Sequence, residues 1–252
     1  MNFGVIGGTG FYTLAEGSEE VEIETAYGPV KVNRAKIGGH DVAFIARHGA
    51  GHAVPPHRVN YRANIMALKA AGVGDILASA SVGTMSDTMP PGSLVMITQF
   101  LDFTKSRAGT FFDGDSGEVV HTDMTDPYCP HLRQELAQAA AALGEQVVSR
   151  GTYVCVEGPR FETPAEIEMF RRMGGDLVGM TNVPEVVLAR EAGICYAAVA
   201  AVTNWAAGIA PEPLKHQEVS GFMEGQTPRL RALFAHVIAN HRETECRCRQ
   251  SA

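Results

Sequence analysis

Short, nearly continuous apolar segments alternate with segments of helical periodicity along almost all of the 252 residues. An apolar segment without alternating polar residues predicts a strand that is covered on both faces of its sheet. Strands are predicted at residues 1–8, within 21–49, and at 75–83, 93–103, 146–159, 176–182 and 195–204. Helices are predicted at residues 57–72, 129–144, 163–174, 184–193 and 227–245. This alternation predicts a single α/β domain at residues 1–243 with a mostly parallel sheet, followed by a tail at residues 244–252.

Composition and charge exclude several classes of function. The chain is 45% hydrophobic and 19% charged, as expected for one globular domain with a sizeable core. Its net charge of -7, without a basic stripe interleaved with aromatic residues, argues against a nucleic-acid partner. No apolar run reaches membrane-spanning length, and the first residues lack the pattern of a signal peptide. We therefore expect a cytoplasmic protein without a membrane partner.

The five cysteines predict no metal site from their spacing. Cys129, Cys155 and Cys195 are isolated and are expected to be small buried hydrophobic residues. Cys246 and Cys248 form a C-x-C motif between arginines, which favour the thiolate form. An inert, frayed terminus is expected here, with a redox pair as the alternative. An odd number of cysteines without a recurring zinc-type spacing matches neither a disulfide framework nor a zinc site.

Polar residues beside glycine follow five of the predicted strands. Ligands of such sheets bind beyond the carboxyl ends of the strands, so these residues are candidates for one site. Glycine backbone N–H groups and threonine hydroxyls can hold an oxyanion, and arginine and histidine add charge-assisted hydrogen bonds. The anion-binding candidates are Thr9, Arg47, His48, Ser81 and Thr181, and the candidates for contact with a flat polar ring are Phe161, Glu162 and Asn204. An anion held beside a flat heterocycle indicates nucleoside or nucleotide chemistry.

Three histidines within ten residues, His48, His52 and His57, raise the alternative of a metal site. Their spacing matches no zinc pattern, and Pro55–Pro56 prevents a helix that would place them on one face. We expect no metal and a structural role for His57. A non-catalytic protein that binds a metal through histidine and cysteine is the alternative, which stoichiometric zinc would favour.

The segments "GVIGGTG", "VEGPRFET", "GMTNVPE" and "VTNWAAG" resemble the purine nucleoside phosphorylase and methylthioadenosine phosphorylase family in its trimeric branch. The resemblance extends from about residue 4 to the final helix. It implies a single-domain nucleoside phosphorylase fold with a mixed central β-sheet flanked by helices. It also implies that a purine nucleoside reacts with inorganic phosphate, giving free base and ribose 1-phosphate without a metal or organic cofactor. A homotrimer, or a dimer of trimers, would be the assembly.

The resemblance assigns roles to individual positions. Phosphate-binding positions are Thr9, Arg47, His48, Ala80, Ser81 and Thr181. Ala80 departs from the hydroxyl residue of the methylthioadenosine branch, so Ser79 or Ser81 would supply that contact. Substrate-binding positions are Phe161 against the base, Met180 against the ribose, His121 lent by a neighbouring subunit to the 5′ end, His216 at the 5′-hydroxyl, and Glu162, Asn204 and Ala206 at the base. His48, Glu162 and Asn204 would be catalytic, holding phosphate below C1′ and stabilising charge on the departing purine.

The residues at the base positions predict which purine is used. An asparagine amide offers a donor and an acceptor, suited to O6 and N7 of a 6-oxopurine, whereas a carboxylate only accepts. The methylthioadenosine branch has aspartates where this chain has Asn204 and Ala206, and Glu162 adds an acceptor for N1–H. We expect cleavage of inosine and guanosine, with Trp205 mainly in packing. Phosphorolysis of S-methyl-5'-thioinosine or S-methyl-5'-thioadenosine is the alternative. A nucleoside hydrolase would need a cluster of metal-binding aspartates, of which the strand ends carry too few.

Overall fold

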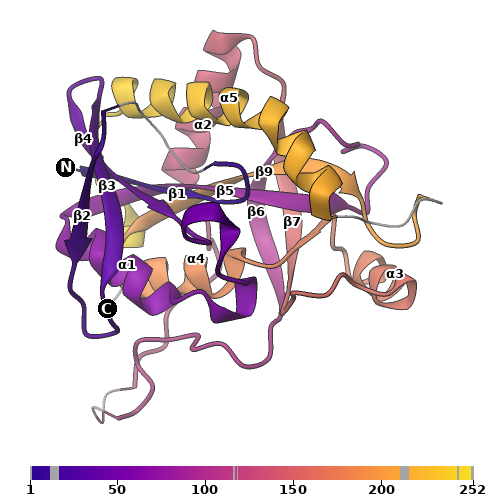
Figure 1. Cartoon of the computed structure of the whole chain (residues 1–252), viewed down its shortest axis with the longest axis horizontal. Helices are drawn as coiled ribbons and strands as arrows, with labels where there is room; N and C mark the ends of the chain where they lie inside the picture. Colours follow the sequence, from indigo (N-terminus) through magenta and orange to yellow (C-terminus); the bar gives the residue numbers. More distant parts are fainter. Residues whose placement is uncertain are drawn as a thin grey trace.

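The computed structural model describes residues 2–11, 17–115, 117, 119–210, 216–242 and 244–250. These residues form one nine-stranded sheet with helices on both sides (Figure 1). The strands are β1 (Asn2–Gly7), β2 (Glu19–Ile23), β3 (Val30–Ile37), β4 (His40–Ala46), β5 (Val73–Thr84), β6 (Leu94–Phe103), β7 (Val147–Val156), β8 (Leu177–Gly179) and β9 (Cys195–Trp205). The α-helices are α1 (Tyr61–Ala70), α2 (Pro130–Leu143), α3 (Pro164–Arg172), α4 (Asn182–Glu191) and α5 (His216–Asn240). Short 3-10 helices are η1 (Ala50–His52), η2 (Pro56–Arg58) and η3 (Arg247–Gln250).

The sheet is mixed, with strand order β2-β3-β4-β1-β5-β8-β7-β6-β9. The strands β4, β1, β5 and β9 are parallel neighbours, whereas β2, β3 and β4 form an antiparallel meander. The apolar pattern predicted a mostly parallel sheet and missed the antiparallel pairings β5–β8 and β6–β9. Because β9 pairs with both β5 and β6, the strands β5, β8, β7, β6 and β9 close into a ring.

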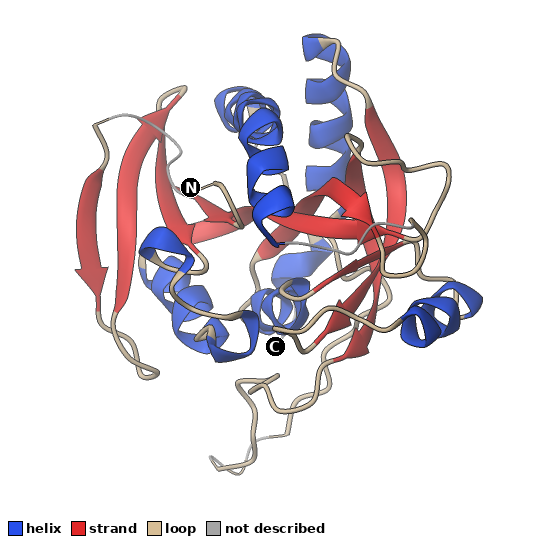
Figure 2. Ribbon diagram, turned by 45° about the vertical axis from the view of Figure 1, so that its right-hand side comes forward, coloured by secondary structure: helices blue, strands red, loops and turns tan. Residues whose placement is uncertain are grey.

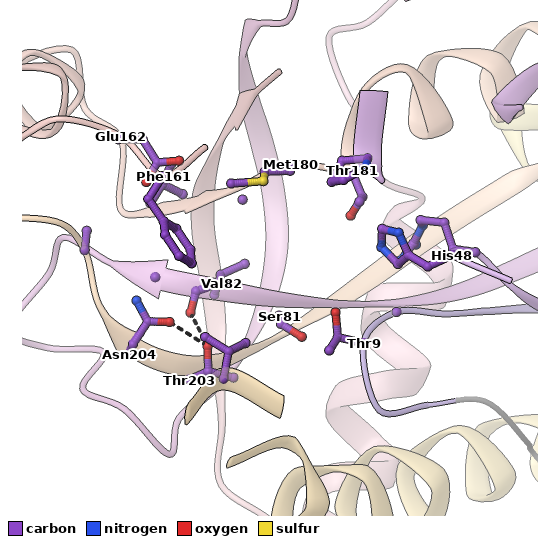
Figure 3. Close-up of a pocket in the computed structure, with 18 of the residues that line it drawn as sticks. Thr9, His48, Ser81, Val82, Phe161, Glu162, Met180, Thr181, Thr203 and Asn204 are labelled. Carbon is purple, nitrogen blue, oxygen red and sulfur yellow. Dashed lines mark hydrogen bonds between the residues drawn. The ribbon is translucent and has the colours of Figure 1, made fainter. Parts of the chain in front are cut away.

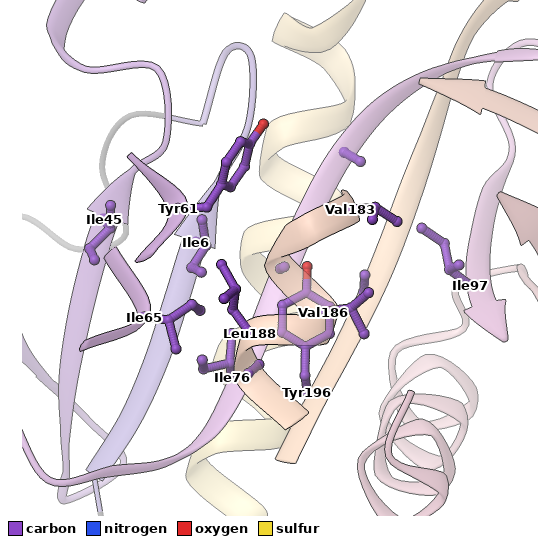
Figure 4. Close-up of a cluster of buried hydrophobic side chains, with 14 of the residues drawn as sticks. Ile6, Ile45, Tyr61, Ile65, Ile76, Ile97, Val183, Val186, Leu188 and Tyr196 are labelled. Carbon is purple, nitrogen blue, oxygen red and sulfur yellow. The ribbon is translucent and has the colours of Figure 1, made fainter. Parts of the chain in front are cut away.

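Two helical layers bury the two faces of the sheet. On one face, α1 and α4 pack over Ile6, Ile76 and Tyr196 (Figure 4). On the other face, α2 and α5 cover a second apolar cluster, to which Leu136 and Phe234 belong. Figure 2 shows α3 apart from these layers, beyond one end of the sheet. Within the described residues no helix is long and apolar enough to cross a membrane.

The last helix is longer than its sequence predicts. The sequence predicted a start at residue 227, yet α5 begins at His216 and runs through Gly221, Gly225 and Pro228. Met223, Leu230 and Phe234 are fully buried along it, and Thr227 Oγ1 donates to Met223 O at 2.8 Å. Burial of this apolar face therefore outweighs the cost of proline and glycine inside a helix.

The tail also differs from its prediction. Residues 244–250 return to the body of the protein, where Cys248 is buried in the cluster between α2 and α5. The expectation of a frayed terminus was wrong, because the tail forms the short helix η3 and buries Cys248 against the body of the protein.

Candidate active site

A cavity lies where the carboxyl ends of β1, β4, β5, β8 and β9 meet (Figure 3). Most of the predicted site residues line it: Thr9, Arg47, His48, Ser81, Phe161, Glu162, Met180, Thr181, Asn204 and Ala206. Thr9, His48, Ser81 and Thr181 lie at one end, and Phe161, Glu162 and Asn204 at the other, with Met180 between them. The cavity thus has the two ends that the sequence predicted.

At the end of the cavity where the sequence predicts an anion, the hydroxyl group of Ser81 is not used by the fold. Ser81 Oγ is buried and has no hydrogen-bond partner among the residues that the structure describes. Thr181 stands at the N-terminus of α4, and its hydroxyl does not cap that helix. The backbone N–H groups of Thr181 and Val183 donate to Tyr153 Oη and Cys155 Sγ, so the fold uses them. A buried hydroxyl without a protein partner, such as that of Ser81, is an expected feature of an oxyanion site.

His48 is held at this end by the segment that follows it. Its Nδ1 lies 2.8 Å from Val54 O, and because a carbonyl only accepts, Nδ1 carries the proton. The ring of His52 lies 4.1 Å from that of His48, and His52 adopts a left-handed φ of 60°, uncommon for a residue with a side chain. His52 also lines the cavity, which the sequence analysis did not predict.

Arg47 has a buried partner that the sequence did not reveal. Its Nε and Nη2 donate to the two carboxylate oxygens of Glu185, each at 2.6 Å, and Nη1 donates to Ser79 O at 2.9 Å. Tyr196 donates to the same carboxylate at 2.7 Å. Burial acts to lower the pKa of Arg47, but the charge of Glu185 and its hydrogen bonds raise it above the usual arginine value. The guanidinium therefore lines the cavity with its charge largely compensated.

Neighbouring residues of β5 divide between the cavity and the core. Ser79 is fully buried and its Oγ accepts the Gly8 N–H at 3.0 Å, which fixes the first glycine-rich turn. Ser81 faces the cavity, while Ala80 belongs to the apolar cluster and does not line it. Successive residues of a strand point to opposite faces, so the Ala80 side chain points away from the cavity. It does not make the phosphate contact that the sequence predicted.

At the base end, Asn204 is held in one orientation. Its Nδ2 donates to Trp205 O at 2.8 Å, and its Oδ1 accepts from Thr203 Oγ1 at 2.8 Å. A carbonyl cannot donate, so the amide nitrogen must be the atom that faces Trp205. One Nδ2 hydrogen and one Oδ1 lone pair remain for a ligand. Trp205 itself does not line the cavity, in keeping with the expected packing role.

A β-bulge explains why two adjacent residues of β9 both reach the cavity. Val82 pairs with Val202 and Gly83 with Asn204, so Thr203 is an extra residue in the ladder. Such an insertion breaks the alternation of side chains. A Cβ on Gly83 would lie 3.1 Å from Asn204 Nδ2, so glycine at this position leaves room for the amide. Thr203, missed in the sequence, positions Asn204.

Glu162 is a buried carboxyl group at the same end. Burial, and secondarily the charge of Glu166, raise its pKa above the usual glutamate value. The turn that carries Phe161 and Glu162 is held by the capping box of α3, where Thr163 and Glu166 exchange hydrogen bonds. Arg160 binds the Glu166 carboxylate through two hydrogen bonds of 2.8 and 2.7 Å.

Of the two residues predicted at the 5′ end of the substrate, the structure describes the side chain of one. His121 is exposed on the β6–α2 connection and does not line the cavity of its own chain. His216 begins α5, and its side chain lies outside the described part of the structure.

The groups able to hold a metal lie away from this cavity. Among the described residues they are the cysteines 129, 195, 246 and 248, and the group of His131, Glu135 and His241. Neither group shares a residue with the cavity lining. The histidines 48, 52 and 57 do not form such a group in this part of the chain. A metal bound by cysteine would therefore be compatible with a phosphorylase. The sequence analysis had treated bound zinc as a sign of a non-catalytic metal-binding protein instead.

The strand-end cavity and the mixed sheet are those of a nucleoside phosphorylase, and the chain belongs to the phosphorylase superfamily, whose family model matches residues 2–239. It is a member of the purine nucleoside phosphorylase and methylthioadenosine phosphorylase group of enzymes, which confirms the resemblance and the predicted fold.

Individual relatives differ in their named substrates. A "probable 6-oxopurine nucleoside phosphorylase" from Dictyoglomus turgidum is 52% identical over 254 residues, covering 100% of this chain and 96% of that protein. A "probable S-methyl-5'-thioinosine phosphorylase" from Methanopyrus kandleri is 52% identical over 237 residues, 93% of this chain and 91% of that protein. The solved methylthioadenosine phosphorylase from Schistosoma mansoni in complex with adenine superposes with a TM-score of 0.90 at 33% identity, covering 94% of this chain and 91% of that one.

Proposed function

We propose that the protein cleaves 6-oxopurine nucleosides, inosine and guanosine, with inorganic phosphate to free base and ribose 1-phosphate. The observation that carries this proposal is the fixed Asn204 amide at the same end of the cavity as the Glu162 carboxyl group. The remaining Nδ2 hydrogen suits O6 or N7, and an ionised Glu162 suits the N1–H donor. Adenine has an acceptor at N1, so it would leave two buried acceptors facing each other.

The proposed reaction needs no protein nucleophile. A phosphate oxygen forms the new bond to C1′, the bond from C1′ to the purine nitrogen breaks, and its electron pair stays on the base. Because Glu185 compensates the charge of Arg47, we assign most of the binding of phosphate to Thr9, His48, Ser81 and Thr181. Asn204 would stabilise the negative charge on the departing base. Phosphate is a co-substrate, and no cofactor enters these steps.

Phosphorolysis of S-methyl-5'-thioinosine is the second candidate, favoured by the Methanopyrus kandleri relative. It requires the same base contacts. Val219 of α5 adds an apolar side chain to the cavity lining, which would accept a methylthio group. S-methyl-5'-thioadenosine fits less well, since Glu162 opposes its base.

A homotrimer, alone or paired into a hexamer, and a cytoplasmic location belong to the same proposal. The exposed position of His121 supports the assembly, because a residue outside its own cavity can serve a neighbour's. All five cysteines are unpaired thiols, as expected in a reducing compartment.

Phosphate-dependent release of base from inosine, guanosine, adenosine, methylthioinosine and methylthioadenosine tests the proposal. We expect inosine or guanosine to have the highest kcat/KM and no release without phosphate. Faster cleavage of either adenine nucleoside would overturn the base preference. Phosphate-independent release would indicate a hydrolase.

A further inference from the structure

Four of the five cysteines lie together at the amino ends of β5 and β9. Cys129 precedes α2, Cys195 begins β9, and Cys246 and Cys248 come from the tail. Their four sulfur atoms all lie within 4.8 Å of one another. The catalytic cavity lies at the other end of β9, roughly 30 Å away at the usual rise per strand residue. The cluster is therefore separate from the active site.

The spacing of the sulfurs suits a metal ion. Cys129 Sγ and Cys246 Sγ are 3.6 Å apart, whereas a disulfide would place them at about 2.05 Å. Tetrahedral zinc with bonds of about 2.3 Å to sulfur separates its ligands by about 3.8 Å. Cys248 contacts the sulfurs of Cys129, Cys195 and Cys246, so the group is mutually adjacent.

Two of the four ligands are held by the fold. The Cys129 N–H donates to Tyr196 O at 2.7 Å, which ties it to the residue after Cys195. Cys129 Sγ accepts the Leu132 N–H in the first turn of α2. The body of the protein thus offers a preformed pair, and the tail supplies the other two ligands.

Positive side chains surround the cluster. Arg249 contacts Cys195 and also donates to Asp75 Oδ2 at 2.8 Å. Arg190 is buried, and its charge acts on Cys248. Four thiolates and a divalent cation carry a net charge of minus two, which two nearby arginines would offset in part.

We propose that Cys129, Cys195, Cys246 and Cys248 bind one zinc ion that fastens the C-terminal tail to the amino ends of β5 and β9. The site is structural, since all four positions are taken by protein ligands and none remains for a substrate.

Metal analysis of the full-length protein tests this site. The chain is purified under reducing conditions, freed of metal with a chelator and given one equivalent of zinc or cobalt(II). We expect one ion per chain, cobalt absorption typical of a tetrahedral tetrathiolate, and a higher Tm with metal than without.

Variants separate the site from general damage to the fold. Cys246→Ser/Cys248→Ser changes only the tail and should reduce bound metal to background and abolish the metal-dependent rise in Tm. Cys155→Ser is the matched control, because Cys155 lies outside the cluster and exchanges hydrogen bonds with Val183 that serine can keep. It should retain one ion per chain. Arg249→Gln should weaken zinc affinity roughly 10- to 100-fold, as expected for a group beside metal ligands.

Three results would overturn the proposal: reduced wild-type protein that takes up no metal, a double tail variant that keeps the metal, or cysteines that form disulfides and bind no metal after reduction. Phosphorolysis measured on the same samples reports the proposed function independently. If the double tail variant loses the metal but still releases base with phosphate, both the zinc site and the proposed function are supported.

Discussion

Ser79 and Ser81 occupy one strand but serve different partners, and this contrast gives a test of the phosphate site. Ser81→Ala should raise the KM for phosphate roughly 10- to 100-fold, because a hydrogen bond to a charged group contributes about 1.5–3 kcal/mol. Its stability should change little, since Ser81 Oγ has no partner within the described chain. Steady-state kinetics at varied phosphate measure the effect.

Ser79→Ala should give the opposite pattern. It leaves the buried Gly8 N–H without its acceptor, so the free energy of unfolding should fall by about 1–3 kcal/mol. An unchanged phosphate KM in the Ser81 variant would remove Ser81 from the site.

Arg47→Ala is a poorer probe, because it also leaves the Glu185 carboxylate buried without its main partner.

The raised pKa of Glu162 predicts a pH dependence. The carboxylate accepts N1–H more strongly than the protonated acid does, so kcat/KM for inosine should fall as the pH decreases through a pKa above the usual glutamate value. Glu162→Gln should remove this acidic limb and reduce the preference for inosine over adenosine roughly tenfold or more. Glu168→Gln, on the exposed face of α3, should leave the pH profile unchanged. The same acidic limb in both variants would contradict this role.

Asn204→Asp tests the base contact directly. A carboxylate oxygen would replace the nitrogen that now donates to Trp205 O, so two acceptors would face each other. We expect kcat/KM for inosine to fall more than that for adenosine, and a gain on adenosine only with Ala206→Asp as well. The ratio of the two kcat/KM values measures the effect, and an unchanged ratio would refute the role of Asn204.

At the scale of elements, the α3 capping box should support substrate binding from outside the cavity. Thr163→Ala removes the acceptor of the Glu166 N–H and should cost about 1 kcal/mol of stability. Because Phe161 and Glu162 directly precede this cap, the KM for inosine should also rise. Urea denaturation and kinetics measure the two effects, and Thr163→Ser, which can keep the bond, should show neither.

The sequence predicted nearly every helix and strand, because local periodicity decides those features. It also predicted that polar residues from several strand ends would lie together, since parallel strands bring their carboxyl ends together, whereas their contacts with phosphate and base stay predictions. The Arg47–Glu185 pair, the bulge at Thr203 and the cysteine cluster were missed. Each depends on contacts between residues distant in sequence, such as Cys129 and Cys246, which spacing along the chain does not reveal.

At the scale of the whole molecule, the β6–α2 connection predicts an assembly with shared sites. The start of this connection packs against the body, where the Phe111 N–H donates to Glu191 of α4, but Val119, two residues before His121, is 74% exposed. A trimer would cover this apolar side chain and bring His121 to a neighbouring cavity. We expect a trimeric or hexameric mass in solution by light scattering.

Mixed assemblies test the sharing. Co-expression of His121→Ala and Asn204→Ala chains should restore part of the activity that each variant lacks alone, because some sites then contain neither change. Separately purified variants mixed without subunit exchange are the control. A monomeric mass, or no recovery in verified mixed assemblies, would contradict the shared site.

The bulge in β9 has a consequence for how enzymes of this kind diverge. Two consecutive codons, those of Thr203 and Asn204, specify side chains that both enter the cavity, while the ladder on either side keeps its pairing. Single-base mutations there can change a side chain that lines the cavity without insertion or rearrangement of the scaffold. Deletion of one codon would have a different outcome, because it would turn the remaining side chain away from the substrate. Selection can therefore vary the identity of the residues at positions 203 and 204, but it must preserve the number of residues in this part of β9.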